Sequence, residues 1–198
     1  KRADVLELFS RYALQVCEGQ QFDMDYEQRR DVHIDEYVEM IRLKTAVLLS
    51  CALQVGAACA GAPREQQVHI GSYGEHLGLA FQLRDDLLDA FGDPGKVGKQ
   101  VGGDLRAGKK TYLLIRGLEL SLAAGRHELR EELAKAPTDR NVPRMLNVLE
   151  ELGVRTETEA EVHKHDAQAM AALAALNVPV ERKAALTQLA ATLLQRTS

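Results

Sequence analysis

The chain has 198 residues, 45% of them hydrophobic and 27% charged, with a formal net charge of −4 at pH 7. This length suffices for a single domain, 1–198, with a sizeable core, and the charge gives no basic surface of the kind that nucleic-acid binding needs. The sequence begins directly in an amphipathic pattern and has no apolar run of about eighteen residues, so we expect neither a signal peptide nor a membrane span.

Apolar residues recur at helical spacing along most of the chain, and residues that favour helix, such as Ala, Leu, Glu and Gln, are abundant. No long stretch alternates with period two, so no sheet is expected. Prolines and glycines separate the segments. The pattern predicts an all-α protein with helices over 3–23, 35–60, 64–91, 109–122, 125–136, 141–152, 157–176 and 180–195.

The first predicted helix carries an apolar stripe that ends in polar groups. Its members are Val5, Phe9, Tyr12, Val16 and Gly19. Gln20 and Asp23 continue this stripe, which indicates polar groups that point into the protein, toward a partner or a cavity. Spacing alone favours equally a helix end that frays in water.

A lysine interrupts the stripe of the second predicted helix. The stripe consists of Tyr37, Ile41, Lys44, Leu48, Cys51 and Val55. A buried ammonium is costly unless it is paired, so Lys44 indicates a functional cation. The alternative is a side chain whose aliphatic stem packs on the helix while its ammonium reaches the surface.

Aspartates dominate the end of the third predicted helix, which reads FQLRDDLLDAFGD from Phe81. Residues three and four apart share a helical face, so Gln82, Asp85, Asp86 and Asp89 crowd one flank. Neighbouring carboxylates repel each other unless a cation lies among them. Mg²⁺ suits a site whose protein oxygens surround the ion incompletely, because it takes its other oxygens from water and phosphate.

A loop rich in glycine and lysine follows over 92–108, longer than most connections in a compact domain. It contains Lys96 and Lys99, and Lys109 and Lys110 come directly after it. An acidic helix alone is most often a solvated face, and such a loop alone is most often a surface loop. The acidic helix is followed directly by the loop, and Asp104 lies between the lysines. This order indicates a site in which the carboxylates bind a metal, the metal binds a phosphate, and the lysines also bind that phosphate.

Two further groups of reactive side chains carry no functional prediction. His163, His165 and Asp166 lack the spacing of a metal chelate, so we expect a solvated helix face. Three cysteines, Cys17, Cys51 and Cys59, also lack metal-ligand spacing and indicate reduced core thiols in a cytoplasmic protein.

Four ordered motifs give the chain a family resemblance. They are Gly19-Gln20-x-x-Asp23, Lys44-Thr45, the Phe81–Asp89 motif, and Gly98-Lys99-x-x-Gly102-x-Asp104 with Lys109. Together they resemble the trans-isoprenyl diphosphate synthases, which include farnesyl and geranylgeranyl diphosphate synthases. The resemblance implies the C-terminal portion of an isoprenoid synthase-type helical bundle.

The resemblance also implies an activity and roles for residues. The family joins an allylic prenyl diphosphate to isopentenyl diphosphate, head to tail, with Mg²⁺ or Mn²⁺, and its members are homodimers. The implied metal ligands are Asp85, Asp86 and Asp89, and the implied catalytic cations are Lys44, Lys99 and Lys109. The implied substrate-binding residues are these three lysines with Gln20, Asp23, Thr45, Phe81 and Gln82.

One departure from the family leaves alternatives open. Family members carry a first aspartate-rich motif ahead of the region that resembles this chain, and the chain has none. We therefore expect a C-terminal part that is inactive by itself. A non-catalytic regulatory subunit is the alternative, and a plain helical interaction module would leave Lys44 and the lysine loop unexplained.

Overall fold

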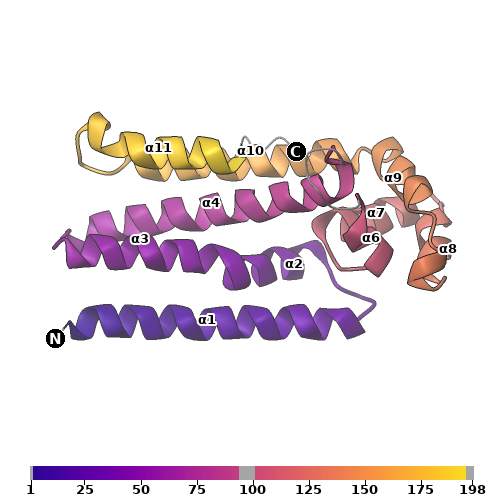
Figure 1. Ribbon diagram of the computed structural model, residues 1–198, viewed down its shortest axis with the longest axis horizontal. Helices are drawn as coiled ribbons and strands as arrows, with labels where there is room; N and C mark the ends of the chain where they lie inside the picture. The colour runs from indigo at the N-terminus through magenta and orange to yellow at the C-terminus, as the bar shows by residue number, and fades with distance from the viewer. Residues whose placement is uncertain (1, 94–100, 195–198) are drawn as a thin grey trace. The chain divides into compact units, whose positions relative to one another are not determined.

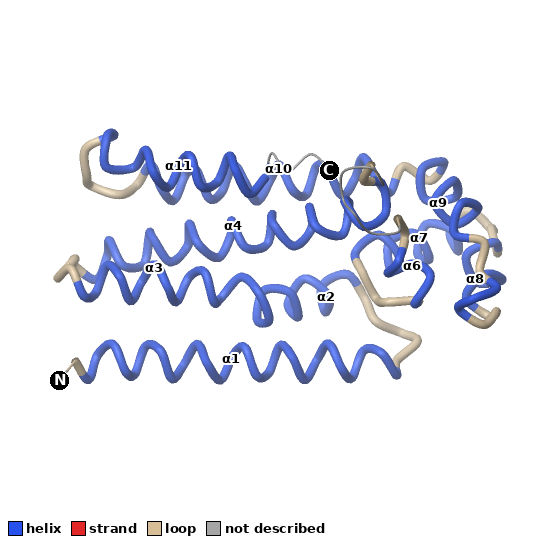
Figure 2. The backbone as a smooth tube through the Cα atoms, viewed as in Figure 1, coloured by secondary structure: helices blue, strands red, loops and turns tan. Residues whose placement is uncertain are grey.

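The computed structural model describes residues 2–93 and 101–194, and within these ranges it contains helices and no strand (Figure 1, Figure 2). The all-α prediction is confirmed. The elements are α1 (Ala3–Gln28), α2 (Ile34–Ile41), η1 (Arg42–Ala46), α3 (Val47–Cys59), α4 (Arg64–Phe91), α6 (Gly103–Ala107), α7 (Tyr112–Ala123), α8 (Glu128–Leu133), η2 (Pro137–Asp139), α9 (Val142–Glu151), α10 (Val154–Ala174) and α11 (Val180–Leu194).

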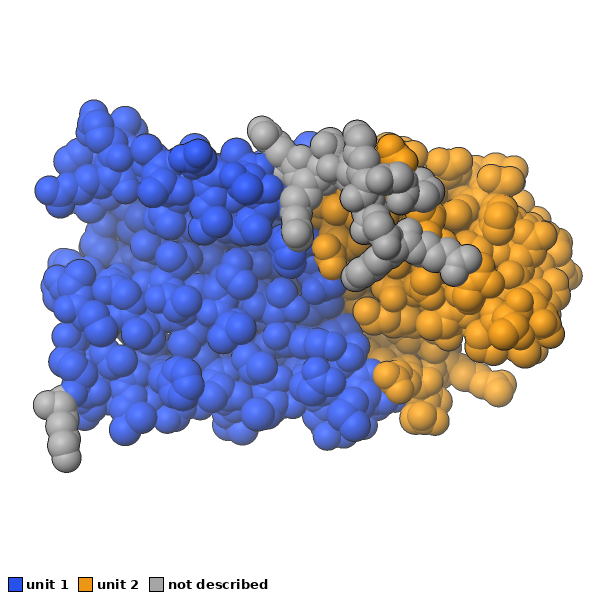
Figure 3. All heavy atoms as spheres, in the orientation of Figure 1, with its two compact units in different colours: residues 1–25, 38–82, 162–196 blue, residues 26–37, 83–161, 197–198 orange. Residues whose placement is uncertain are grey.

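The chain divides into two compact units, each assembled from segments that are distant in sequence (Figure 3). Unit 1 comprises Lys1–Asp25, Val38–Gln82 and Val162–Arg196. Unit 2 comprises Tyr26–Tyr37, Leu83–Glu161 and Thr197–Ser198. A single domain over 1–198 stays a prediction.

A π-helical turn is the main departure from the expected helices. The helix predicted over 35–60 consists of α2, the π turn η1 and α3 in succession. A π turn shifts the helical faces that follow it, because its hydrogen bonds span five residues instead of four. Spacing had therefore placed Leu48 inward, but it is 55% exposed, and its neighbour Val47 is buried instead. Cys51, also in the predicted stripe, is buried as expected.

Unit 1 buries apolar faces of several helices together. Leu8 and Tyr12 of α1 pack with Val47 and Cys51 of α3, whereas Phe9, which spacing had placed in the stripe of α1, is exposed. A second cluster joins α3, α4, α10 and α11 and consists of Tyr73, Leu77, Ala169, Leu173, Leu176 and Ala190, with Leu49 and Leu53 packed against it. These clusters fix the helices that carry the first two motifs.

Buried polar groups in unit 1 bond to one another. Gln54 Nε2 donates to Tyr12 Oη (2.6 Å) and to Ser50 Oγ (3.2 Å), and the two hydroxyls lie 3.0 Å apart. Buried polar atoms need such partners to offset lost hydration. The network accounts for a glutamine inside the most apolar stretch of the sequence.

That apolar stretch also meets a length and composition test for a membrane span. Among the described residues, 34–59 is the helical stretch long and apolar enough to cross a membrane, and 44% of its most apolar window is buried inside the protein. Core helices of globular proteins pass the same test, so this is weak evidence for a span.

Unit 2 has its own core among α7, α8 and α9. Leu113 and Leu114 of α7 are fully buried, as are Leu129 of α8 and Met145 and Leu149 of α9. A Cβ at Gly117 of α7 would overlap the side chain of Leu149 and would lie only 3.1 Å from Leu129 Cδ1. The glycine therefore permits the close approach of three short helices.

Two predictions about reactive side chains are wrong. His165 is not on a solvated face: it is 9% exposed, and its ring stacks on His76 of α4 with the Nδ1 atoms 3.3 Å apart. The three thiols are free, but only Cys51 is buried; Cys17 and Cys59 are exposed. Helical spacing could not tell the buried side chains from the exposed ones here, because it does not show which residues of other helices pack against them.

The histidine pair predicts acid sensitivity of unit 1. Burial lowers the pKa of His76 below its ordinary 6.5. The unfolded chain therefore binds a proton more readily than the folded chain, and the free energy of unfolding falls as the pH drops below about 6.5. We expect denaturant unfolding of the full-length protein to occur at lower urea at pH 5.5 than at pH 7.5, and His76→Gln to reduce this difference.

The control is His163→Gln, which replaces an exposed histidine on the same helix as His165 and should leave the difference intact. An undiminished pH difference in His76→Gln would show that His76 does not cause it.

Candidate functional site

In unit 1, the close approach of α1 to η1 explains the glycine of the first motif. A Cβ at Gly19 would lie 2.7 Å from the carbonyl carbon of Leu43 and would overlap the amide nitrogen of Lys44. Backbone atoms cannot move aside as a side-chain end can, so only glycine fits here. The π turn that carries Lys44 therefore packs directly on the backbone of the Gly19 turn.

Lys44 forms an ion pair with Asp23, the last residue of the motif that begins at Gly19. Its Nζ lies 2.5 Å from Asp23 Oδ2, and both side chains are partly exposed. The ammonium is thus half-buried and matched by a carboxylate, which meets the requirement for a buried cation. Gln20, in contrast, is exposed, so of the two alternatives that spacing left open for it, the inward-pointing side chain is not seen.

Thr45 connects the π turn to the aspartate-rich helix. Its Oγ1 donates to Gln82 Oε1 at 3.2 Å, and Gln82 belongs to α4. The structure thus joins two residues that the family resemblance assigns to substrate binding. Phe81, beside Gln82, is half-buried.

In unit 2, a buried tyrosine binds the second aspartate of α4. Tyr37 Oη donates to Asp86 Oδ2, and the two side chains are 2% and 3% exposed. Burial, with the Asp86 charge next in importance, raises the pKa of Tyr37 well above its ordinary 10, so the phenol remains a donor at neutral pH. The sequence had placed Tyr37 only in an apolar stripe; its hydroxyl was the missed signal.

The third aspartate, Asp89, joins α4 to the segment before Lys109. The amide of Asp104 donates to Asp89 Oδ2 at 3.0 Å, and the amide of Gly102 donates to the Asp89 carbonyl at 2.6 Å. Asp104 Oδ2 in turn lies 3.5 Å from Lys109 Nζ. Asp89, α6 and Lys109 are therefore linked by consecutive contacts.

Asp85 differs from the other two aspartates because its side chain is exposed. Among residues 2–93 and 101–194, no three His, Cys, Asp or Glu side chains are grouped so that they could hold a metal ion. The crowding of all three carboxylates predicted from spacing is therefore not seen, because Asp86 and Asp89 are held by other partners. Mg²⁺ needs only one or two carboxylates when water and phosphate supply the rest, and Asp85 fits that open kind of site.

Of the other lysines that the sequence analysis singled out, two lie outside the described residues and two lie within them. Lys96 and Lys99 fall outside the described residues. Lys109 and Lys110 are described, and burial lowers the pKa of Lys110 below its ordinary 10.5, with Arg140 adding to the effect. The roles predicted for the aspartates and lysines stay predictions.

The chain matches a known protein family and relatives from several organisms. A family model described as polyprenyl synthetase matches residues 1–149. Geranylfarnesyl diphosphate synthase of Aeropyrum pernix is 36% identical over 154 residues, which cover 78% of this chain and 48% of that protein. (2E,6E)-farnesyl diphosphate synthase of Mycobacterium tuberculosis is 34% identical over 195 residues, which cover 96% of this chain and 54% of that protein. The chain spans about half the length of these relatives.

Solved structures agree with this match. A geranylgeranyl pyrophosphate synthase has a TM-score of 0.88 with 42% identity, covering 98% of this chain and 61% of that one. The geranylgeranyl pyrophosphate synthase of Corynebacterium glutamicum complexed with isoprenyl diphosphate and magnesium also has a TM-score of 0.88, with 28% identity and coverage of 98% and 56%.

The bond between Tyr37 and Asp86 predicts a stability effect. Tyr37→Phe removes one donor from a buried carboxylate and leaves the aromatic packing in place. We expect the free energy of unfolding of the full-length protein to fall by about 1–3 kcal/mol, measured by urea denaturation.

An unchanged free energy of unfolding in Tyr37→Phe would contradict the importance given to the Asp86 bond.

Proposed function

The chain belongs to the polyprenyl synthetase family, and we propose that the full-length protein is a prenyltransferase. In this proposal it condenses an allylic prenyl diphosphate with isopentenyl diphosphate, head to tail, to make a longer trans-prenyl diphosphate. The named relatives that support the proposal are farnesyl, geranylgeranyl and geranylfarnesyl diphosphate synthases.

One observation carries the proposal at the level of residues. Of the three aspartates of the α4 motif, two are engaged by protein donors and the third, Asp85, is exposed. A solvated acidic face would leave all three carboxylates in water. Protein donors that hold two of the carboxylates, while the third is presented to solvent, suit an open magnesium site, which needs only one or two protein carboxylates.

The cations of the chain act on the leaving group. When the allylic carbon–oxygen bond ionises, negative charge builds on the departing diphosphate. Lys44 and Lys109 each stand within reach of a carboxylate, so their ammonium groups are oriented before substrate arrives. Preorganised charges of this kind stabilise developing charge without reorganisation during the reaction. Lys99 has the same proposed role and lies outside the described residues.

The polar pair of Thr45 and Gln82 has an orienting role in this proposal. Their hydrogen bond holds both side chains in one arrangement. Mg²⁺, when bound at Asp85, would supply Lewis-acid neutralisation of the diphosphate. Isopentenyl diphosphate loses a proton in the reaction, and we assign its removal to the released pyrophosphate, so no acid–base side chain is needed.

Assembly and location complete the proposal. We propose a homodimer in the cytoplasm, as the family resemblance implies, and light scattering of the purified full-length protein tests the assembly. The proposed cofactor is Mg²⁺, which Mn²⁺ can replace. A neighbour solved with isoprenyl diphosphate and magnesium supports the metal.

A product assay tests the activity. The full-length protein is incubated with Mg²⁺, labelled isopentenyl diphosphate and allylic primers of different length, and the products are sized. A discrete prenyl product supports the synthase and gives its chain length. Diphosphate binding without product would identify a non-catalytic subunit and overturn the proposed activity.

Substitution of Asp85 tests its assigned role. Asp85→Ala should lower kcat by about 10³-fold, or about 4 kcal/mol of barrier, because the exposed carboxylate is the proposed metal ligand. Steady-state kinetics at saturating Mg²⁺ measure the effect. Glu181→Ala removes an exposed carboxylate of α11 and should change nothing. Near-normal turnover of Asp85→Ala would remove Asp85 from the site.

A further inference from the structure

Arg140, in the segment between η2 and α9, caps two short helices of unit 2 at once. Its Nη1 donates to the Arg106 carbonyl at 2.6 Å, and its Nη2 donates to the Leu133 carbonyl at 3.1 Å. Arg106 lies in the last turn of α6, and Leu133 ends α8. The last carbonyls of a helix lack partners within the helix, and a cation there also matches the helix dipole.

The same guanidinium packs against the backbone that leads into Lys109. Gly108 has φ +75°, and a Cβ there would lie 2.8 Å from Arg140 Nη1. The amide of Lys109 donates to the Asp104 carbonyl at 3.0 Å. Arg140 therefore holds the end of α6 at the position where the chain turns toward Lys109.

The segment that Arg140 holds connects the aspartate motif to the lysine. The Asp104 amide, near the start of α6, binds the Asp89 carboxylate, and the Asp104 carboxylate pairs with Lys109. α6 has only five residues, too few to keep its shape by its own hydrogen bonds. Its position depends on contacts with the rest of unit 2: the buried Leu105 in its middle, Asp89 at one end and Arg140 at the other.

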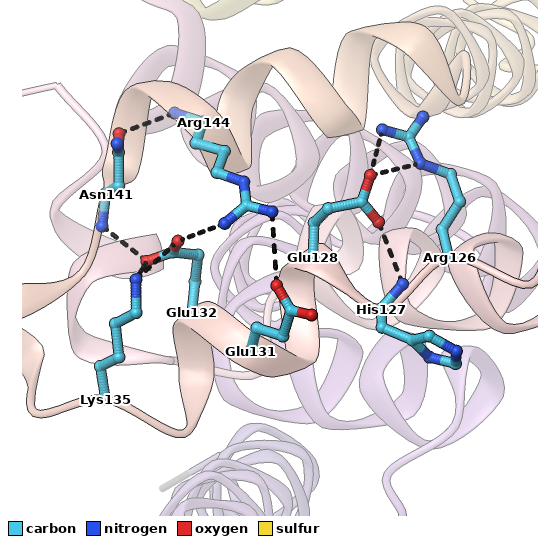
Figure 4. Close-up of polar contacts among 8 residues, drawn as sticks. All are labelled: Arg126, His127, Glu128, Glu131, Glu132, Lys135, Asn141 and Arg144. Atoms are coloured by element: carbon cyan, nitrogen blue, oxygen red, sulfur yellow. Dashed lines mark hydrogen bonds and ion pairs between the residues drawn. The ribbon is translucent and has the colours of Figure 1, made fainter.

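A buried carboxylate, that of Glu132, binds the backbone at Asn141 (Figure 4). Glu132 is 1% exposed and accepts hydrogen bonds from the Asn141 amide (2.9 Å), Lys135 Nζ (2.8 Å) and Arg144 Nη1 (3.1 Å). The Asn141 amide foremost, and Lys135 next, lower the pKa of Glu132 to about 2. Since Asn141 directly follows Arg140, Glu132 anchors the backbone from which the guanidinium extends.

We propose that Arg140 is a positioning residue for Lys109 and Asp104 in the prenyl transfer reaction. The inference rests on the proposed function, in which Lys109 neutralises the departing diphosphate. Arg140 acts through the end of α6 and touches no substrate. Its planar fork reaches two carbonyls in different helices, which a single ammonium cannot do in the same way.

The test uses the full-length protein and three variants. Arg140→Met keeps an unbranched apolar stem and removes both hydrogen bonds. Arg140→Lys keeps the charge and loses the fork. Arg126→Met is the matched control: Arg126 also joins short elements of unit 2, through Glu128 and Glu151, and has no hydrogen bond or ion pair to α6 among its described contacts.

Three readouts separate positioning from general stability. They are kcat, the affinity for inorganic pyrophosphate with Mg²⁺ measured by calorimetry, and hydrogen exchange of the Asp104 and Lys109 amides. A misplacement of about 1 Å can cost about 10²-fold in rate, so Arg140→Met should lower kcat by about 10–100-fold. It should also weaken pyrophosphate binding and speed exchange of both amides. KM for isopentenyl diphosphate should stay unchanged.

We expect Arg140→Lys to lower kcat and pyrophosphate affinity less than Arg140→Met does. Arg126→Met should keep wild-type kinetics, even if it lowers the unfolding midpoint as much as Arg140→Met does. Wild-type kcat, pyrophosphate affinity and amide exchange in Arg140→Met would overturn the proposal. If Arg140→Met does not fold, the same three readouts on Arg140→Lys decide the question.

Failure of the proposed function would be distinguishable. A wild-type protein that makes no prenyl product overturns the function alone. Pyrophosphate affinity and amide exchange then still decide whether Arg140 positions Lys109 and Asp104.

Discussion

The central constraint on this structure is the negative charge at the end of α4. Three aspartates occur within five residues of one helix, and the last of them, Asp89, lies in the final turn, where the helix dipole disfavours a negative charge. The protein treats each carboxylate differently. Asp86 is buried against the Tyr37 hydroxyl, Asp89 receives the Asp104 amide, and Asp85 is exposed. Asp86 and Asp89 are thereby held by protein donors, and Asp85 is presented outward.

The position of Lys44 in unit 1 depends on backbone packing of a different kind. In unit 1 the π turn η1 places Lys44 and Thr45 on consecutive positions that lie against α1 and near Gln82 of α4. π turns are uncommon and occur often at functional sites. Here the turn tolerates the approach of α1 because Gly19 has no side chain. The motif glycine and the motif lysine are therefore parts of one packing arrangement.

Much of this could be predicted from the sequence, for identifiable reasons. Helical spacing and the prolines located α4, α9 and α11 closely, because these are regular helical segments, whereas α1 runs to Gln28, five residues past its predicted end. The π turn could not be predicted, since it leaves no mark in residue spacing, and Leu48 was therefore placed on the wrong face. Residues whose importance comes from a distant partner were missed as well. Tyr37 matters because it binds Asp86, and His165 because it stacks on His76. Arg140 matters because it binds the ends of α6 and α8.

The division of work among the three aspartates is the claim that most needs a direct measurement. A crystal structure of the full-length protein with Mg²⁺ and pyrophosphate would provide it. The account predicts that an Asp85 oxygen coordinates the ion, while Asp86 still accepts the Tyr37 hydroxyl and Asp89 still accepts the Asp104 amide. A structure in which Asp86 leaves Tyr37 to coordinate the metal, or in which Asp85 remains in bulk water, would contradict it.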